Sequence, residues 1–144
     1  MRVYLDNCCF NRPFDDQRHL RIRLEAEAKL RIQEVIREGG LQLAWSYVLD
    51  FENSNNPFVD RREATRAWRT DATVDCVETA AVKATAGAFA RIGLRKIDAL
   101  HVACAVNAGC VYFITTDDQV LGKADQISEI KIADPIEFIK KELP

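Results

Sequence analysis

Two kinds of side chain near the start of the sequence could carry chemistry: the acid Asp6 and the adjacent cysteines Cys8 and Cys9. The cysteines could bind a metal ion or form a redox pair. However, the sequence has no C-x-x-C motif, adjacent cysteines rarely bind one tetrahedral ion, and the only histidines are His19 and His101. Five cysteines are an odd number and no secretory signal is recognisable, so we expect no disulfide framework. We therefore interpret the cysteines as small, free, buried residues.

Four acids stand where expected strands and helices could bring them together. Asp6 directly follows an apolar strand over 2–5, and Asp117 follows another over 111–115. Glu52 lies in the short helix after a strand over 41–45, and Asp98 lies in the first turn of a later helix. Each acid alone has an ordinary explanation in an Asx turn, a helix cap or a helix dipole. In a parallel sheet, however, ligands gather outside the carboxyl ends of the strands, and all four could reach that edge.

Asp98 is the most informative of these acids, because its surroundings are apolar. The segment 94–109, LRKIDALHVACAVNAG, is apolar on nearly every helical face from Ile97 to Ala108, which is typical of a buried helix. A buried ionised carboxylate costs several kcal/mol without a partner, whereas a helix dipole supplies only about 0.3–1 kcal/mol. We therefore expect Arg95, Lys96 or a metal ion next to Asp98.

Carboxylates that converge on one buried point repel each other unless a divalent cation lies between them. Ligation by oxygen alone favours Mg²⁺ or Mn²⁺ over zinc. The natural task of such a site is chemistry at a phosphoryl oxygen, in which one ion activates water and a second, where present, stabilises the leaving oxygen.

The elements that would position these acids alternate between strand and helix. We predict strands over 2–5, 41–45, 74–77, 111–115 and 130–133, and a polar loop over 7–17. We predict helices over 18–38, 46–53, 59–71, 79–91 and 97–108, a short helix that ends near residue 124, and a terminal helix from Pro135. In the first long helix, Leu20, Leu24 and Ala28 belong to the predicted apolar face. This alternation predicts the α/β class with a mostly parallel sheet, and 144 residues fit one domain, 1–144.

Charge and hydropathy exclude some classes of function. The formal net charge of −2 argues against a protein that simply coats nucleic acid, but not against an enzyme that neutralises phosphate through bound metal. No run of about 18 apolar residues could span a bilayer, and Asp6 stands where a secretory signal would need an apolar segment. We therefore expect a cytoplasmic protein without a membrane partner.

Taken together, these residues carry a resemblance to a known family. Asp6 after a first strand, Glu52 on a short helix, the stretch KIDALH (96–101) and the turn Thr115-Thr116-Asp117 resemble a PIN-domain protein. This ribonuclease family includes many toxins of toxin–antitoxin pairs. The resemblance covers nearly the whole chain, and the D-A-x-H segment and the T-x-D turn are its more specific parts. Many members have Ser, Thr or Asn two residues after the first acid, where this chain has Cys8.

The resemblance implies a three-layer α/β/α sandwich and cleavage of RNA at an acidic pocket. It implies Asp6, Glu52, Asp98 and Asp117 as the catalytic, metal-binding acids, and Mg²⁺ or Mn²⁺ as the cofactor. Thr115 and Thr116 would offer hydroxyls to the substrate, and Arg12 is the preferred phosphate contact because its loop leaves the first strand. An antitoxin that buries the site and a homodimer are further implied partners.

The expected activity is therefore a metal-dependent endoribonuclease. The alternative is a catalytically weak PIN-like module that binds RNA or another protein, although the presence of all four acids argues against it. An aspartyl-phosphate fold would need an Asp-x-Asp or an acid pair at the first strand, which Asp6-Asn7-Cys8 does not supply. His101, three residues after Asp98, could hydrogen-bond that acid or its surroundings, but we favour a buried histidine that hydrogen-bonds to the backbone, and the sequence assigns no role to Asp118.

Overall fold

The computed structural model describes residues 1–143 and contains a five-stranded sheet. The strands are β1 (Arg2–Leu5), β2 (Gln42–Ser46), β3 (Ala72–Cys76), β4 (Tyr112–Ile114) and β5 (Lys131–Ala133). Their order is β3-β2-β1-β4-β5, and every neighbouring pair is parallel. The central strand is fully buried from Val3 to Leu5, as expected for a strand covered on both faces. The predicted parallel sheet is confirmed.

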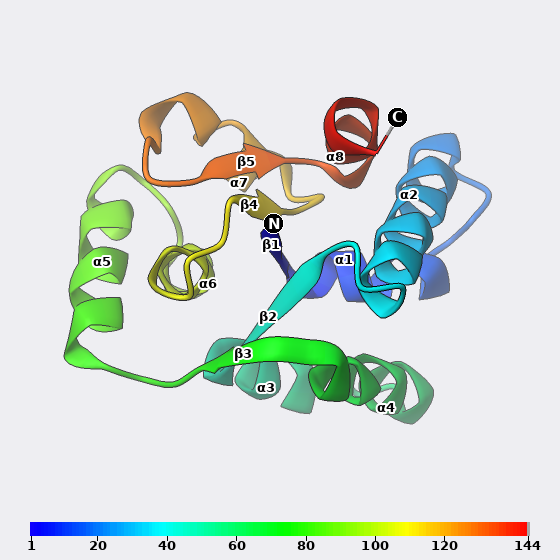
Figure 1. Cartoon of the computed structure of the whole chain (residues 1–144), viewed down its shortest axis with the longest axis horizontal. Helices are drawn as coiled ribbons and strands as arrows, with labels where there is room; N and C mark the ends of the chain where they lie inside the picture. Colours follow the sequence, from blue (N-terminus) through cyan, green and yellow to red (C-terminus); the bar gives the residue numbers. More distant parts are fainter. Residues whose placement is uncertain (144) are drawn as a thin grey trace.

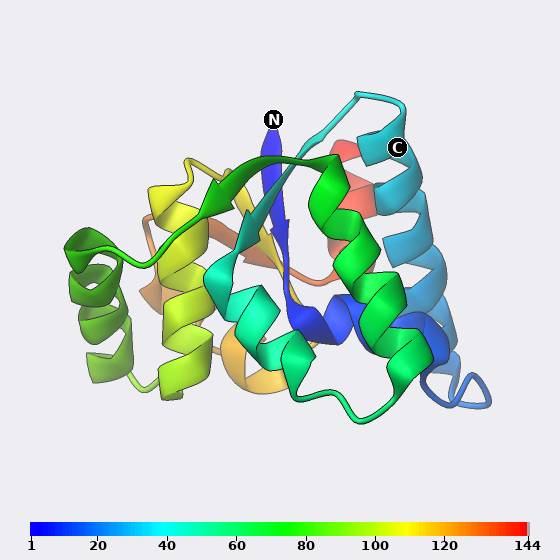
Figure 2. The same cartoon turned by 90° about the horizontal axis from the view of Figure 1, so that it is seen from below.

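Helices cover the sheet on both faces. Within the described residues they are α1 (Asn7–Asn11), α2 (Leu20–Arg37), α3 (Tyr47–Ser54), α4 (Val59–Ala67), α5 (Ala80–Arg91), α6 (Lys96–Asn107), α7 (Asp118–Leu121) and α8 (Pro135–Glu142). Figures 1 and 2 show α5 and α6 on one side of the sheet and α2 and α8 on the other. The predicted α/β/α sandwich is therefore confirmed. None of the helices described has the length and apolar character to cross a membrane.

The segment after β1 differs from its prediction. We expected a loop over 7–17, but the chain forms α1 and then a 3₁₀ helix, η1 (Arg12–Phe14). The Asp6 side chain accepts a hydrogen bond from the backbone N–H of Asn7 and thereby caps α1. Cys9 and Phe10 are buried in the core, so two apolar residues within a polar stretch are enough to hold this short helix.

The first turns of α2 also face differently from the prediction. Leu20 and Leu24 are 59% and 46% exposed, whereas Glu25 and Lys29 are buried. The Arg12 guanidinium lies 3.1 Å from the Glu25 carboxylate, and this ion pair allows a charged side chain to occupy the inner face. Apolar periodicity therefore misplaced the buried face in the first turns of α2, whereas Ala28 and the later residues of the predicted apolar face are buried as predicted.

Three other elements have shifted limits. The helix expected over 59–71 ends as an α-helix at Ala67 and continues as a 3₁₀ turn, η2 (Trp68–Asp71). The strand expected over 74–77 is β3, which begins two residues earlier at Ala72. The short helix expected to end near residue 124 is α7, followed by the 3₁₀ helix η3 (Ala124–Gln126).

The order of the strands determines where a ligand can bind. From β1 the chain builds β2 and β3 on one side and later returns to add β4 and β5 on the other. The direction of winding reverses between β1 and β4, and in open parallel sheets the crevice at such a switch point is the usual ligand site. The residues that follow β1 and β4 lie at this crevice.

Candidate metal centre

Asp6 and the turn after β4 meet at the carboxyl edge of the sheet. Leu5 of β1 is the register partner of Ile114 in β4, and the Asp6 backbone N–H donates to the Ile114 carbonyl oxygen at 2.9 Å. The residue after each of these strands, Asp6 and Thr115, is therefore a neighbour across the sheet edge. The Thr115 hydroxyl donates to Asp6 Oδ2 at 2.8 Å.

Asp6 is buried and held by several donors. Besides the Thr115 hydroxyl, its carboxylate accepts from the Asn7 N–H at 2.8 Å, and the Cys8 thiol lies 3.5 Å from Oδ2. Cys8 Sγ is also 3.4 Å from Thr115 Oγ1. Cys8 thus gives Asp6 a weak thiol contact, while Thr115 gives the strong hydroxyl donor. Three contacts fix the orientation of this acid.

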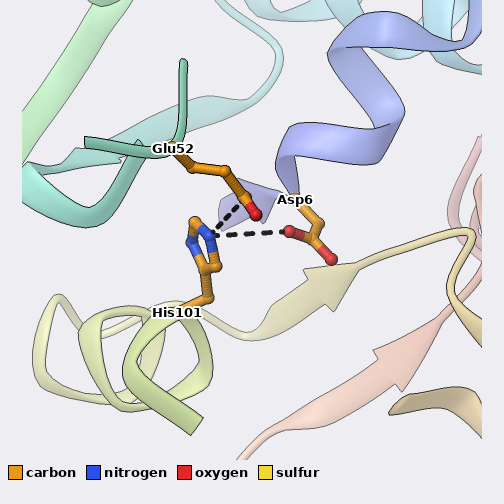
Figure 3. Close-up of side chains that lie close together, drawn as sticks. All are labelled: Asp6, Glu52 and His101. Atoms are coloured by element: carbon orange, nitrogen blue, oxygen red, sulfur yellow. Dashed lines mark hydrogen bonds and ion pairs between the residues drawn. The ribbon is translucent and has the colours of Figure 1, made fainter. Parts of the chain in front are cut away.

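Glu52 reaches the same place from α3. Its carboxylate Oε1 is 2.8 Å from Nε2 of His101, which comes from α6, and the same Nε2 is 3.9 Å from Asp6 Oδ1 (Figure 3). One ligand atom of each residue lies within 4.8 Å of the other two. Burial opposes a charged imidazole, but the hydrogen bond to Glu52 and the charge of Asp6 raise the pKa of His101 above its ordinary value.

Asp98 and Asp117 form the second half of the cluster, around Arg95. The Arg95 guanidinium donates to Asp98 Oδ2 at 2.8 Å and to Asp117 Oδ2 at 2.6 Å. Burial, with the nearby charge of Asp6, raises the pKa of Asp98, and the hydrogen bond from Arg95 offsets part of that rise. Of the three partners expected for Asp98, the structure thus places Arg95 beside it.

The donor set fits a hard divalent cation. Carboxylates from four separate elements converge, and the only compensation in this part of the chain is one guanidinium, one imidazole and hydrogen-bond donors. Asp6 and Glu52 each offer a carboxylate oxygen within 4.8 Å of the other, which is close enough for one ion to contact both acids. The Arg95 guanidinium bridges the two remaining acids, Asp98 and Asp117, in the way that a metal cation would. The structure thus brings all four predicted acids together, in two pairs rather than as one uniform ring of oxygens.

The expectation for His101 was wrong in one respect. This fully buried histidine bonds to side chains rather than to the backbone: Nε2 to Glu52, and Nδ1 to the Tyr4 hydroxyl at 2.6 Å. The Tyr4 hydroxyl is also 2.6 Å from Ser46 Oγ. Sequence reasoning missed Tyr4, although its place two residues before Asp6 on a strand puts both side chains on the same face of the sheet.

The other predicted residues are placed as follows. Arg12 is paired with Asp15 at 3.0 Å as well as with Glu25, and its side chain is 20% exposed, so much of its hydrogen-bonding capacity is used within the fold. Thr116 is buried beside Thr115. Its carbonyl oxygen accepts from Arg21, which also binds Asp118 at 2.8 Å. Asp118 therefore ties the start of α7 to α2.

A cavity of about 330 Å³ opens beside the Arg95 pair. It is lined by Gly93, Leu94, Arg95, Asp98, Gln119 and Lys123. Arg95 has a 58% exposed side chain, so its guanidinium is accessible from this side. The cavity joins an acid of the cluster to two cationic side chains, which suits a phosphate group.

Comparisons with known proteins place the fold. No family model matches the sequence, and no curated protein matches it. Among solved structures, a chain of VapBC2 from Rickettsia felis, described as bound to a DNA fragment from their promoter, is similar with a TM-score of 0.57. The match covers 93% of this chain and 98% of that chain at 10% sequence identity. At this identity the likeness concerns architecture, and it confirms that the chain has the PIN-like α/β/α fold that the sequence resemblance implied.

Proposed function

We propose that this protein is a metal-dependent endoribonuclease with Asp6, Glu52, Asp98 and Asp117 as its metal-binding acids. The observation that carries the proposal is the meeting of these acids at the crevice between β1 and β4. Asp6 and Glu52 bring carboxylate oxygens within 4.8 Å of each other, with His101 beside them, and Arg95 joins the other two acids. A merely structural role would not require four carboxylates from four elements at the sheet edge where ligands bind.

The proposed cofactor is Mg²⁺ or Mn²⁺, because the acids offer hard oxygen ligands. When bound, such an ion would supply Lewis-acid stabilisation of phosphate oxygens and lower the pKa of water for in-line attack, leaving a 5′-phosphate and a 3′-hydroxyl. Thr115 holds Asp6 in place through its hydroxyl. Arg95 and Lys123, which line the same cavity, are placed to bind the RNA phosphates.

The test is cleavage of 5′-labelled single-stranded RNA by the parent protein with Mn²⁺, with Mg²⁺ and with EDTA. Asp6→Asn and Asp98→Asn should each abolish most of the metal-dependent cleavage. Asp125→Asn is the matched control, because Asp125 is an exposed acid in η3, which lies in a separate cavity with the start of β5. Cleavage that continues in EDTA, or full activity in both site variants, would contradict the mechanism.

We also propose that the protein is the toxin of a toxin–antitoxin pair, on the basis of its fold and of its surface. An apolar cleft of about 570 Å³ lies beside the acids, lined by Tyr47, Val48, Phe51, Glu78, Lys96, Ile97 and Leu100. Phe51 precedes Glu52 and is 62% exposed, and exposed apolar surface of this kind is typical of protein interfaces. An antitoxin protein is the proposed occupant, and a homodimer is a further proposed assembly.

Co-expression with the product of the neighbouring gene tests this part. A copurifying partner that suppresses the Mn²⁺-dependent cleavage would support the toxin assignment. Cleavage that the product of the neighbouring gene neither binds nor suppresses would favour RNA processing outside a toxin pair. RNA binding without cleavage under any metal condition would favour the alternative, a catalytically weak RNA-binding module.

A further inference from the structure

Glu52 differs from Asp6 in how it is held. Asp6 is buried and accepts from the hydroxyl of Thr115 and the N–H of Asn7. The Glu52 side chain is longer, is 34% exposed, and within residues 1–143 its carboxylate has one hydrogen-bond partner, His101 Nε2. A flexible glutamate on a short helix therefore depends on one contact for its position at the site.

The imidazole of His101 is in turn held in place by Tyr4. The imidazole of His101 has no solvent exposure, and its second nitrogen, Nδ1, is 2.6 Å from the hydroxyl of Tyr4, which is equally buried. The two rings also pack edge to face with centroids 5.8 Å apart. Tyr4 therefore fixes the rotation of the imidazole.

The chain of contacts ends at the helix that carries Glu52. The Tyr4 hydroxyl is 2.6 Å from Ser46 Oγ, and Ser46 Oγ accepts from the Leu49 N–H at 3.1 Å as the N-cap of α3. One tyrosine hydroxyl thus links the cap of α3 to His101 on α6. The hydrogen bond between His101 and Glu52 leads back to α3 and completes this ring of contacts (Figure 3).

Each hydrogen bond from Ser46 through Tyr4 and His101 to Glu52 can be given a donor and an acceptor. An ionised Glu52 carboxylate only accepts, so Nε2 of His101 must carry a proton toward it. The Tyr4 hydroxyl can donate to Nδ1 or accept from it, so it satisfies the ring in either protonation state. Hydrogen bonds of this kind orient the ligands of a metal site, and their loss typically weakens metal affinity by about 10- to 100-fold.

We propose that His101 is a positioning residue, held by Tyr4 and Ser46, that aims the Glu52 carboxylate at the metal site without itself binding the ion. This inference rests on the proposed function and deepens it by assigning a role to the buried network. It distinguishes His101 from the four acids, which offer oxygen ligands.

The test measures binding of Mn²⁺ alone by isothermal titration calorimetry, without RNA. His101→Ala should weaken binding at least about 10-fold. His101→Gln keeps an N–H near the position of Nε2 and should stay within about threefold of the parent. Tyr4→Phe keeps the ring and removes the hydroxyl, and we expect it to bind several-fold more weakly. Tyr112→Phe is the matched control, because its buried hydroxyl binds Glu142 at 2.8 Å and not the site.

The readouts separate this inference from the proposed function. If the parent binds Mn²⁺ and His101→Ala binds it equally well, the positioning role is wrong while the metal site stands. If His101→Gln is as weak as His101→Ala, and electron spin-echo spectra show an imidazole nitrogen bound to Mn²⁺ in the parent, then His101 is a ligand and the inference is overturned. A parent that binds no Mn²⁺ and does not cleave RNA overturns the proposed function as well. Urea unfolding of each variant confirms that it is folded under the binding conditions.

Discussion

Lys29→Met should stabilise the protein at neutral pH, because Lys29 lies in the interior of the fold with little compensation. The residue is 4% exposed, and its ammonium lies 5.5 Å from the centroid of the Phe10 ring. It takes part in none of the ion pairs found within residues 1–143, whereas Glu25, one turn earlier on α2, has two arginine partners. Methionine has a similar length and no charge, so it can fill the same space.

The magnitude follows from the pKa of this lysine. Burial lowers the pKa of Lys29 from its ordinary 10.5 to about 8, which corresponds to a cost of about 3 kcal/mol for the charged form in the folded state. Below pH 8 the side chain is protonated in the folded and unfolded states, so the full cost is present. Between pH 8 and 10.5 the unfolded state binds more protons, so this group makes stability rise with pH. Above that window the cost disappears.

The assay is urea unfolding of the parent, Lys29→Met and the control Lys140→Met between pH 6.5 and 10, where Lys140 is an exposed residue of α8. Burial raises the pKa of Cys9, and of Cys110 to about 12, so these thiols make stability fall at alkaline pH. Both thiols are present in all three proteins, so the difference between parent and variant removes the contribution of Cys110 and leaves that of Lys29 together with its charge interaction with Cys9. We expect Lys29→Met to be more stable by about 3 kcal/mol at pH 7, with a smaller advantage at pH 10, and Lys140→Met to lie within about 0.5 kcal/mol. An advantage that is absent at pH 7, or that does not change with pH, would show that the Lys29 ammonium stays hydrated in the fold.

Two further predictions concern the acidic cluster. Thr115→Val removes a buried hydroxyl that donates to Asp6 and accepts from the Asp117 N–H, so urea unfolding should show a loss of about 1–3 kcal/mol from the unpaired groups. A loss below about 0.5 kcal/mol would mean that water replaces this hydroxyl. Arg95→Gln removes the cation that joins Asp98 to Asp117, and because this cation competes with a divalent ion, calorimetry should show Mn²⁺ binding several-fold tighter, with a larger gain at low salt. Weaker binding in this variant would show that Arg95 supports the site instead of competing for it.

The sequence predicts the carboxyl-edge part of the site well, for a simple geometric reason. Asp6 and Thr115 follow parallel strands, and β1 and β4 are adjacent, so finding the strand ends is enough to place both residues at one edge. Asp98 also needed a partner because it lies in an apolar helix, and Arg95 is that partner. Spacing alone could not choose between Arg95 and Lys96, since the choice depends on which side chain faces Asp117.

Sequence reasoning missed the buried polar side chains whose hydrogen-bond or ion-pair partners lie far away in the sequence. Tyr4 is an ordinary aromatic residue of a strand until His101, far along the chain, is known to meet its hydroxyl. The inner face of α2 was misplaced in its first turns because hydropathy assigns Glu25 to solvent, whereas Arg12 and Arg21 stabilise it inside. Long-range pairing of charges and hydroxyls has no periodicity, so no local pattern reports it.

The two halves of the acidic cluster are compensated by different groups, and this bears on how the site can exist before a metal binds. Four ionised carboxylates at one crevice would raise one another's pKa values and oppose folding. Here Arg95 neutralises one pair, and the imidazole of His101 donates to one member of the other. The fold can therefore form with its acids already in place, so metal binding need not supply the energy that assembles them. A divalent ion bound there would meet an exposed guanidinium on one side and a fully buried imidazole on the other, and of these two groups only Arg95 lines an open cavity into which it could move.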